Sequence, residues 1–187
     1  MLSTLKKLLE SEKIDKSIFD IVIYGSFAKG KEYPRDIDIL VIFIEGSLRE
    51  RLEKIQEIKF KIKNEIKNEI DIKQSLLMEL FSPSFLGKTG IFLEGISIFD
   101  NKDFSEKIGF RPYALFSYSL KNLAHAQKVR FNYLLAGRKR KGIIEEFGGE
   151  RVVSGAIKIP IANSIAFEQI LKNNKVPYAK KGILEEI

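Results

Sequence analysis

The sequence contains no cysteine, no tryptophan and a single histidine, His125. Without cysteine the chain can form neither disulfides nor thiolate metal sites, and one histidine argues against a histidine-based zinc site or a Ser-His-Asp triad. Any catalysis must therefore depend on carboxylates, hydroxyls, lysines or a hard metal ion.

Long apolar runs are also absent. The longest stretches, such as residues 37–44, fall well short of the about 20 residues that span a bilayer. The N-terminal residues carry two lysines and then two glutamates, with no long apolar core of the kind found in secretory signals. We therefore expect no membrane association and a cytoplasmic protein.

The net charge of +7 is unevenly distributed along the 187 residues. Residues 1–101 contain 16 basic and 17 acidic residues, whereas residues 102–187 contain 16 and 8. Residues 121–142 hold seven basic residues and no acidic one. Such a segment attracts phosphate groups, although a charged run by itself is more often a solvated surface.

Hydrophobic periodicity in the first half predicts alternating helices and strands. Leu48, Leu52, Ile55 and Ile58 recur every three or four residues, which predicts an amphipathic helix over residues 48–66. A short helix is expected within 1–13, and strands are expected at 19–24, 37–44 and 69–73. The alternation predicts an α/β (α+β) architecture.

The second half is predicted to form a basic C-terminal extension. A helix is expected from Pro112 to a stop at Gly137, with Tyr118 and Phe131 packed in the core. A β-α-β segment should follow, with strands at 152–159 and 176–184 around a helix at 164–172. We place the domain boundary between residues 104 and 105, which gives domains 1–104 and 105–187.

A group of acidic and small residues follows two of the predicted strands. Gly25 and Ser26 come directly after the first, and Asp36 and Asp38 open the next. Strand residues at i and i+2 point to the same side, so the two aspartates share a face. Their like charges would raise one pKa or recruit a divalent cation, and oxygen-only ligands suit Mg²⁺ or Mn²⁺.

A third acidic residue follows on a later strand. Asp71 lies between Ile70 and Ile72, and Glu69 competes for the same role on the same strand face. We prefer Asp71 because its isoleucine neighbours imply a deeper position in the strand. Three acids together could hold two cations for in-line displacement at phosphorus.

The loop between the first two strands is suited to phosphate. Gly25 lets the backbone turn tightly, and the Ser26 hydroxyl can bond phosphate oxygens. Lys29, Lys31 and Arg35 add positive charge on the same loop. We therefore assign Gly25, Ser26, Lys29 and Arg35 to nucleotide binding.

These motifs together resemble a known signature. The run Ile23–Gly30, followed by Arg35–Leu40, is similar to the signature of the DNA polymerase β nucleotidyltransferase superfamily, above all its minimal members in archaea and bacteria. The resemblance covers roughly residues 15–100 and implies a mixed β-sheet core flanked by helices. The sequence departs from the commoner minimal signature in two ways. Only nine residues separate Ser26 from Asp36, and an arginine, Arg35, precedes Asp36 where a small polar residue is often found.

The resemblance implies a reaction and its ligands. Asp36, Asp38 and Asp71 would bind two Mg²⁺ ions, and Gly25 and Ser26 would hold a triphosphate. An acceptor hydroxyl would attack the α-phosphorus of a nucleoside triphosphate, expected to be ATP, and release pyrophosphate. A protein partner is the acceptor favoured by the family and RNA the acceptor favoured by charge, whereas a small molecule would need a closed acidic pocket.

The strongest basic cluster is expected at the end of the predicted helix. Arg138, Lys139, Arg140 and Lys141 lie between two glycines, and we expect them to contact phosphate of a nucleic acid or of the nucleotide. Alternatively, these cations have only a structural role and offset the negative end of the helix dipole. The alternative function for the whole chain is a non-catalytic nucleic-acid-binding or regulatory module that retains the fold.

Overall fold

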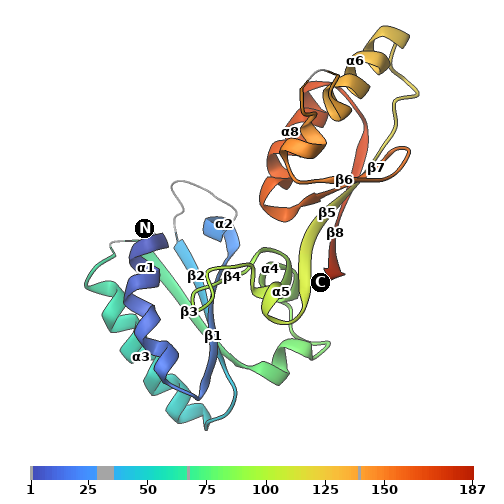
Figure 1. The fold of residues 1–187 in the computed structure, drawn as a ribbon. Coiled ribbons are helices and arrows are strands. Elements are labelled where there is room, and N and C mark those ends of the chain that lie inside the picture. Colours follow the sequence, from blue (N-terminus) through green and yellow to red (C-terminus); the bar gives the residue numbers. More distant parts are fainter. Residues whose placement is uncertain (1, 29–35, 67, 139) are drawn as a thin grey trace. The chain divides into compact units, whose positions relative to one another are not determined.

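The computed structural model describes residues 2–28, 36–66, 68–138 and 140–187. The chain divides into two compact units, Met1–Gly109 and Phe110–Ile187, and each contains one four-stranded sheet (Figure 1). None of the helices in these four ranges is long and apolar enough to cross a membrane.

A mixed sheet forms the centre of the first unit. Its strand order is β3-β2-β1-β4. The strands are β1 (Ile18–Tyr24), β2 (Asp36–Phe43), β3 (Glu69–Leu76) and β4 (Ile96–Ser97). β1 runs antiparallel to β2 and β4, whereas β2 and β3 are parallel. The parallel pair requires a crossover connection, and α3 (Leu48–Lys63) provides it. The expected α/β class is confirmed.

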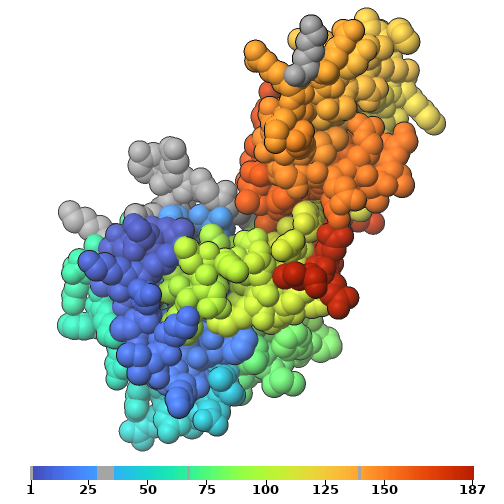
Figure 2. All heavy atoms as spheres, in the orientation of Figure 1, coloured from blue at the N-terminus to red at the C-terminus, as the bar shows by residue number. Residues whose placement is uncertain are grey.

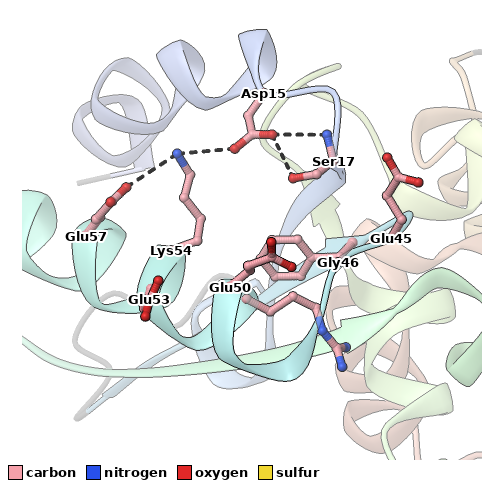
Figure 3. Close-up of a pocket in the computed structure, with 10 residues that line it drawn as sticks. Asp15, Ser17, Glu45, Gly46, Glu50, Glu53, Lys54 and Glu57 are labelled. Atoms are coloured by element: carbon pink, nitrogen blue, oxygen red, sulfur yellow. Dashed lines mark hydrogen bonds and ion pairs between the residues drawn. The ribbon is translucent and has the colours of Figure 1, made fainter.

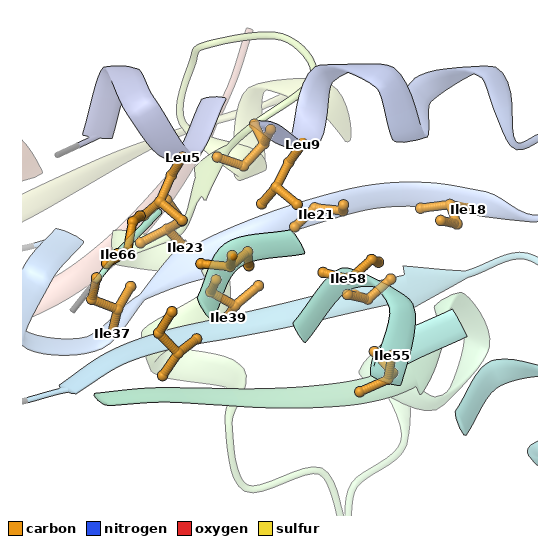
Figure 4. Close-up of a cluster of buried hydrophobic side chains, with 14 of the residues drawn as sticks. Leu5, Leu9, Ile18, Ile21, Ile23, Ile37, Ile39, Ile55, Ile58 and Ile66 are labelled. Atoms are coloured by element: carbon orange, nitrogen blue, oxygen red, sulfur yellow. The ribbon is translucent and has the colours of Figure 1, made fainter. Parts of the chain in front are cut away.

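Two helices cover one face of this sheet. The face is packed by α3, by α1 (Leu2–Leu9) and by the 3-10 helix η1 (Glu10–Ile14) that continues α1 (Figure 4). α3 begins at a capping box in which Ser47 and Glu50 bond each other's backbone amides. Its apolar stripe is buried as predicted, but the helix ends at Lys63, three residues before the predicted end.

The other face of the sheet packs against shorter elements. These are η2 (Leu77–Phe81), α4 (Lys88–Glu94) and α5 (Phe104–Lys107). Leu40 and Ile42 of β2 contact this cluster, whereas Ile39 and Val41 contact the α1–α3 side. β2 is thus buried on both faces along most of its length, as its continuous apolar sequence predicts.

A buried ion pair fastens the end of the first unit to β1. Asp20 is 0% exposed, and its carboxylate accepts hydrogen bonds from the Ser97 hydroxyl at 2.7 Å and from Lys107 Nζ at 2.8 Å. α5 therefore belongs to the first unit, which ends at Gly109 rather than at the predicted boundary after Phe104.

The N-terminal residues pack beside the segment that follows β4. Figure 2 shows the blue N-terminal residues next to the yellow-green residues near position 100. Lys13 Nζ donates a hydrogen bond to the Phe99 carbonyl at 3.1 Å, and it pairs with Asp100 at 3.4 Å. Contacts between residues far apart in the sequence therefore connect the beginning and the end of the first unit.

The second unit is built on an antiparallel sheet with the order β6-β7-β5-β8. Its strands are β5 (Phe110–Tyr118), β6 (Glu150–Val153), β7 (Ala156–Pro160) and β8 (Tyr178–Glu186). Its helices are α6 (His125–Ala136), α7 (Ile143–Glu146), η3 (Ile161–Asn163) and α8 (Ser164–Asn173). Phe116, Phe131 and Phe167 form the centre of its core.

Two predictions for this unit are wrong. The helix expected from Pro112 is β5 up to Tyr118, because Pro112, Ala114 and Phe116 alternate into the core with a period of two. The helix begins only at His125. The strand expected at 152–159 is a hairpin that turns at Gly155. The final helix and strand are confirmed as α8 and β8.

We expect Lys107→Met to destabilise the protein by about 3 kcal/mol, because it leaves the buried Asp20 carboxylate without a cation. Urea unfolding of the wild type and the variant measures the difference. The double variant Asp20→Asn/Lys107→Met removes both charges and should lose less than the single variant. Equal losses in the two would show that Lys107 acts through packing alone.

Candidate active site

Three neighbouring strands bring the predicted acidic residues together at one edge of the first sheet. Tyr24 of β1 pairs with Asp38 of β2, and Asp38 pairs with Asp71 of β3. In the same register Asp36 pairs with Glu69. Adjacent strands are about 4.8 Å apart. The register therefore places Asp71, and not Glu69, directly beside Asp38.

The acids also share one face of the sheet. Ile37 and Ile39 are fully buried on the side of α1 and α3, so Asp36 and Asp38 must point to the other side. Paired residues of parallel strands point the same way, which puts Asp71 on this face as well. Asp36 and Asp71 are exposed, and Asp38 is half-buried.

The carboxylates are close enough to shift the pKa of Asp38. Burial, and after it the negative charges of Asp36 and Asp71, raise the pKa of Asp38, an effect that Lys73 only partly offsets. Burial also raises the pKa of the Tyr24 hydroxyl, with further contributions from Asp38 and Asp71. The site holds concentrated negative charge and would gain from a cation.

Lys73 is a residue of this site to which the sequence analysis gave no role. Its Nζ lies 3.1 Å from Asp71 Oδ2, and its own pKa is raised by that hydrogen bond first and then by the charges of Tyr24 and Asp71. Lys73 is two residues beyond Asp71 on the same strand, so the strand period places both on one face. That period is the signal that could have indicated Lys73. Tyr24, directly before Gly25, was likewise given no role.

Gly25 is fitted against the Asp38 carboxylate. It follows β1 with a φ of +76° and opens the short helix α2 (Gly25–Ala28). A Cβ at this position would lie 2.1 Å from Asp38 Oδ2. Both the backbone conformation and the close approach require glycine. Ser26 follows and is half-buried. The predicted nucleotide contacts Lys29 and Arg35 lie outside the described residues.

The donor set fits a hard divalent cation by its chemistry. Asp36, Asp38 and Asp71 offer only carboxylate oxygens, on one face and beside one another. Within the described parts of the chain, no three Asp, Glu or His side chains are already arranged around a common metal position. A cation shared by all three acids would have to displace the Lys73 ammonium from Asp71.

A second polar pocket, of about 600 Å³, lies at the opposite end of β2 (Figure 3). It reaches Phe43, five residues beyond Asp38, which corresponds to about 16 Å along a strand. Lys54 there pairs with Asp15 at 3.3 Å and with Glu57 at 3.6 Å. Lys54 offsets only part of the negative charge of this pocket, which is also lined by Arg51. The pocket is therefore separate from the acid cluster in place, at the other end of the strand.

The predicted basic contact residues belong to the second unit. Arg138, Arg140 and Lys141 are exposed after the end of α6, and Lys139 lies outside the described residues. The Arg138 guanidinium lies 5.2 Å from the centroid of the Tyr133 ring. Lys141 pairs with Glu145 at 2.9 Å. The loop thus offers two cations not paired to a carboxylate within the described chain.

A comparison with protein-family models identifies the first unit. The model described as Polymerase beta, Nucleotidyltransferase matches residues 3–103, which is more than half of the chain. No curated protein matches the chain. The matched region begins within α1, ends just before α5, and contains Gly25 and all three acids.

We expect Asp38→Asn to stabilise the protein at pH 7 by about 0.5–1 kcal/mol in a chelating buffer. The pKa of Asp38 is raised above 3.8 in the folded state, so its charged form opposes folding above that folded pKa. The gain should shrink as the pH falls and disappear near pH 3.8. Urea unfolding across this pH range tests it; Glu69→Gln is the control, and a pH-independent gain would contradict it.

We expect Gly25→Ala to cost about 2–3 kcal/mol of stability, because it adds both backbone strain and a clash with Asp38. Gly109→Ala is a matched control. Gly109 has a φ of +86° but open space around the position of a Cβ, so its loss should be only about 1 kcal/mol. Thermal and urea unfolding measure both, and equal losses would show that the approach to Asp38 is unimportant.

Proposed function

This chain belongs to the polymerase beta nucleotidyltransferase family, and we propose that it transfers a nucleoside monophosphate from a nucleoside triphosphate to an acceptor hydroxyl. The observation that carries the proposal is the pairing of Asp38 with Asp71 on neighbouring parallel strands, with Asp36 on the same face. Membership of this family indicates an enzyme. The reaction releases pyrophosphate.

In this proposal Asp36, Asp38 and Asp71 are the catalytic residues and hold two Mg²⁺ ions, for which Mn²⁺ can substitute. Bound ions of this kind neutralise the triphosphate and lower the pKa of the acceptor hydroxyl. Asp71 accepts the hydroxyl proton, and Lys73 leaves Asp71 when the site is loaded. Asp38, on the central strand of the three, would help to hold the ions that neutralise the phosphate charge.

The turn after β1 is proposed to hold the triphosphate. Gly25 presents bare backbone directly beside Asp38, so phosphate oxygens can approach both the backbone amides and the acid cluster. The Ser26 hydroxyl donates a hydrogen bond to the same group. Lys29 and Arg35, which lie between Gly25 and Asp36 in the sequence, are proposed to add positive charge.

ATP is the proposed nucleotide, and the acceptor is a protein partner or RNA. The second unit carries 14 lysine and arginine residues against six acidic residues, and this charge supports RNA. The exposed residues Arg138, Arg140 and Lys141, together with Lys139, are proposed to contact acceptor phosphates. A labelled nucleotide incubated with RNA or with candidate proteins separates the two acceptors.

One observation supports the alternative, a non-catalytic nucleic-acid-binding or regulatory module. The ion pair between Lys73 and Asp71 already neutralises one of the three acids from within the chain. A protein that had no need of metal could keep this pair permanently. Nucleotide binding distinguishes the two functions, because the alternative requires no metal-dependent binding of a triphosphate.

The decisive experiment is calorimetric titration of ATP, GTP, CTP and UTP with Mg²⁺ into the wild type and two variants. Asp71→Asn and Glu69→Gln remove one charge each from the same face of β3. We expect Asp71→Asn to weaken Mg²⁺-dependent binding by about tenfold or more, and Glu69→Gln to leave it unchanged. The reverse result would make Glu69 the third ligand.

The double variant Asp36→Ala/Asp38→Ala provides the second control for this titration. It should lose Mg²⁺-dependent binding completely while remaining folded, because neither side chain contributes to the hydrophobic core. The binding that remains in EDTA measures the part that does not depend on metal. Absence of binding in the wild type as well would favour the non-catalytic module.

A further inference from the structure

A pocket of about 370 Å³ lies in the second unit, outside the region that the family model matches. Four segments supply its walls: the end of β5, the residues after it, α6 and the β6–β7 hairpin. The lining residues are Tyr118, Ser119, Leu120, Lys121, Lys128, Asn132, Arg151, Ser154 and Gly155. The lining contains three cations and no acidic residue.

The three cations of this pocket have no carboxylate partner among the described residues. Some other basic residues of the second unit do: Lys158 pairs with Glu150 and Glu185, and Lys180 pairs with Glu168. Lys128 is half-buried, and a half-buried lysine without a partner opposes folding, whereas Lys121 and Arg151 are exposed. What distinguishes these three cations is that they line one pocket from separate elements, which creates a positive potential suited to a negatively charged ligand.

The walls of the pocket are fixed by tertiary contacts. Lys128 and Asn132 are one turn apart on the same face of α6. Opposite them, the backbone amide of Tyr118 donates a 2.7 Å hydrogen bond to the Gly155 carbonyl. Gly155 has a φ of +82°, and a Cβ there would lie 2.9 Å from the Tyr118 carbonyl. The hairpin that carries Arg151 is thus held tightly against β5.

The uncharged side chains of the pocket indicate which class of anion it suits. The hydroxyls of Ser119 and Ser154 and the amide of Asn132 add hydrogen-bond donors beside the cations, a set that suits phosphate oxygens. The half-buried ring of Tyr118 contacts Phe131 edge-on at 5.9 Å. It forms a firm wall against which a ribose or base can pack.

A second cationic surface begins at the next residue of α6. Tyr133 and Leu134 line a smaller pocket together with Arg138, Arg140, Lys141 and one acid, Glu146. Asn132 of the first pocket directly precedes Tyr133, so the two pockets occupy adjoining faces of one helix. Aromatic rings interleaved with cations along a surface are typical of sites that bind single-stranded nucleic acid.

We propose that the pocket formed by Lys121, Lys128 and Arg151 binds a backbone phosphate of a single-stranded nucleic acid, whose next nucleotides continue along α6 to Tyr133 and Arg138. The binding needs neither metal nor nucleoside triphosphate. It belongs to the second unit alone and is independent of the catalysis proposed for the first. Its test can therefore fail while the proposed function stands, and the reverse.

The test is fluorescence anisotropy of a labelled oligouridylate with the full chain in EDTA. The variant Lys121→Gln/Lys128→Gln/Arg151→Gln should bind about a hundredfold more weakly at 0.1 M salt, and its salt dependence should fall by about two ion equivalents. The control Arg111→Gln/Lys175→Asn/Lys181→Gln removes the same charge from exposed positions of this unit and should retain nearly all the affinity.

A second variant tests whether a loss of binding could result from misfolding instead. Asn132→Asp is almost isosteric and lies on the exposed surface of α6, but it places a negative charge in the pocket. It should weaken RNA binding while the thermal unfolding temperature stays unchanged. Unchanged affinity in both the triple variant and Asn132→Asp would overturn the proposal, as would an equal loss in the control.

Competition identifies the source of the phosphate. Unlabelled oligouridylate should displace the probe, whereas ATP and inorganic phosphate in EDTA should displace it only at far higher concentrations. Equally effective displacement by ATP would make the pocket a mononucleotide site instead. Equally effective displacement by polyglutamate at the same concentration of charge would point to an acidic protein, and would likewise overturn the proposal.

Discussion

The parallel pairing of β2 with β3 is the constraint on which the first unit depends. It exists because α3 buries its apolar stripe against the sheet, starting from the capping box of Ser47 and Glu50, and so returns the chain in the same direction. The register of this pair sets Asp38 beside Asp71. A slip by one residue would turn Asp71 into the core and bring Ile70 to the surface. The burial of isoleucines on one face thus fixes the acids on the other, and a packing requirement determines the geometry of the site.

Charge is handled in two different ways in this unit. Acids with a structural role are paired with lysines: buried Glu12 contacts Lys54 and Lys61, and buried Asp20 contacts Lys107. At the acid cluster, only Asp71 has such a partner among the residues that the structure describes, and burial together with the charges of Asp36 and Asp71 raises the pKa of Asp38. Repulsion that is only partly offset costs stability and is common at sites that bind a cation. The contrast supports a functional rather than a structural purpose for these acids.

The second unit adds a different kind of surface. It carries most of the excess positive charge, and α6 packs against its antiparallel sheet through Phe131. Cations from separate elements line one pocket of this unit, and cations from the residues after α6 line another. The two units therefore have complementary chemistry. One concentrates carboxylates suited to metal and triphosphate, and the other concentrates cations suited to a phosphate backbone.

The sequence by itself determined the features that depend on local pattern: the strand that ends just before Gly25, the strand that begins with the Asp36–Asp38 pair, the amphipathic helix between the second and third strands, and hence the α/β class. Alternation along a strand and the period of a helix depend only on residues close together in the sequence. Only the tertiary structure decided which of Asp71 and Glu69 adjoins Asp38, that Lys73 pairs with Asp71, and that residues 110–118 form a strand rather than a helix. It alone brought Lys121, Lys128 and Arg151 to one pocket. The physical reason is that strand register, sheet pairing and hairpin contacts join residues distant in sequence, and no local pattern records which distant partner a strand will choose.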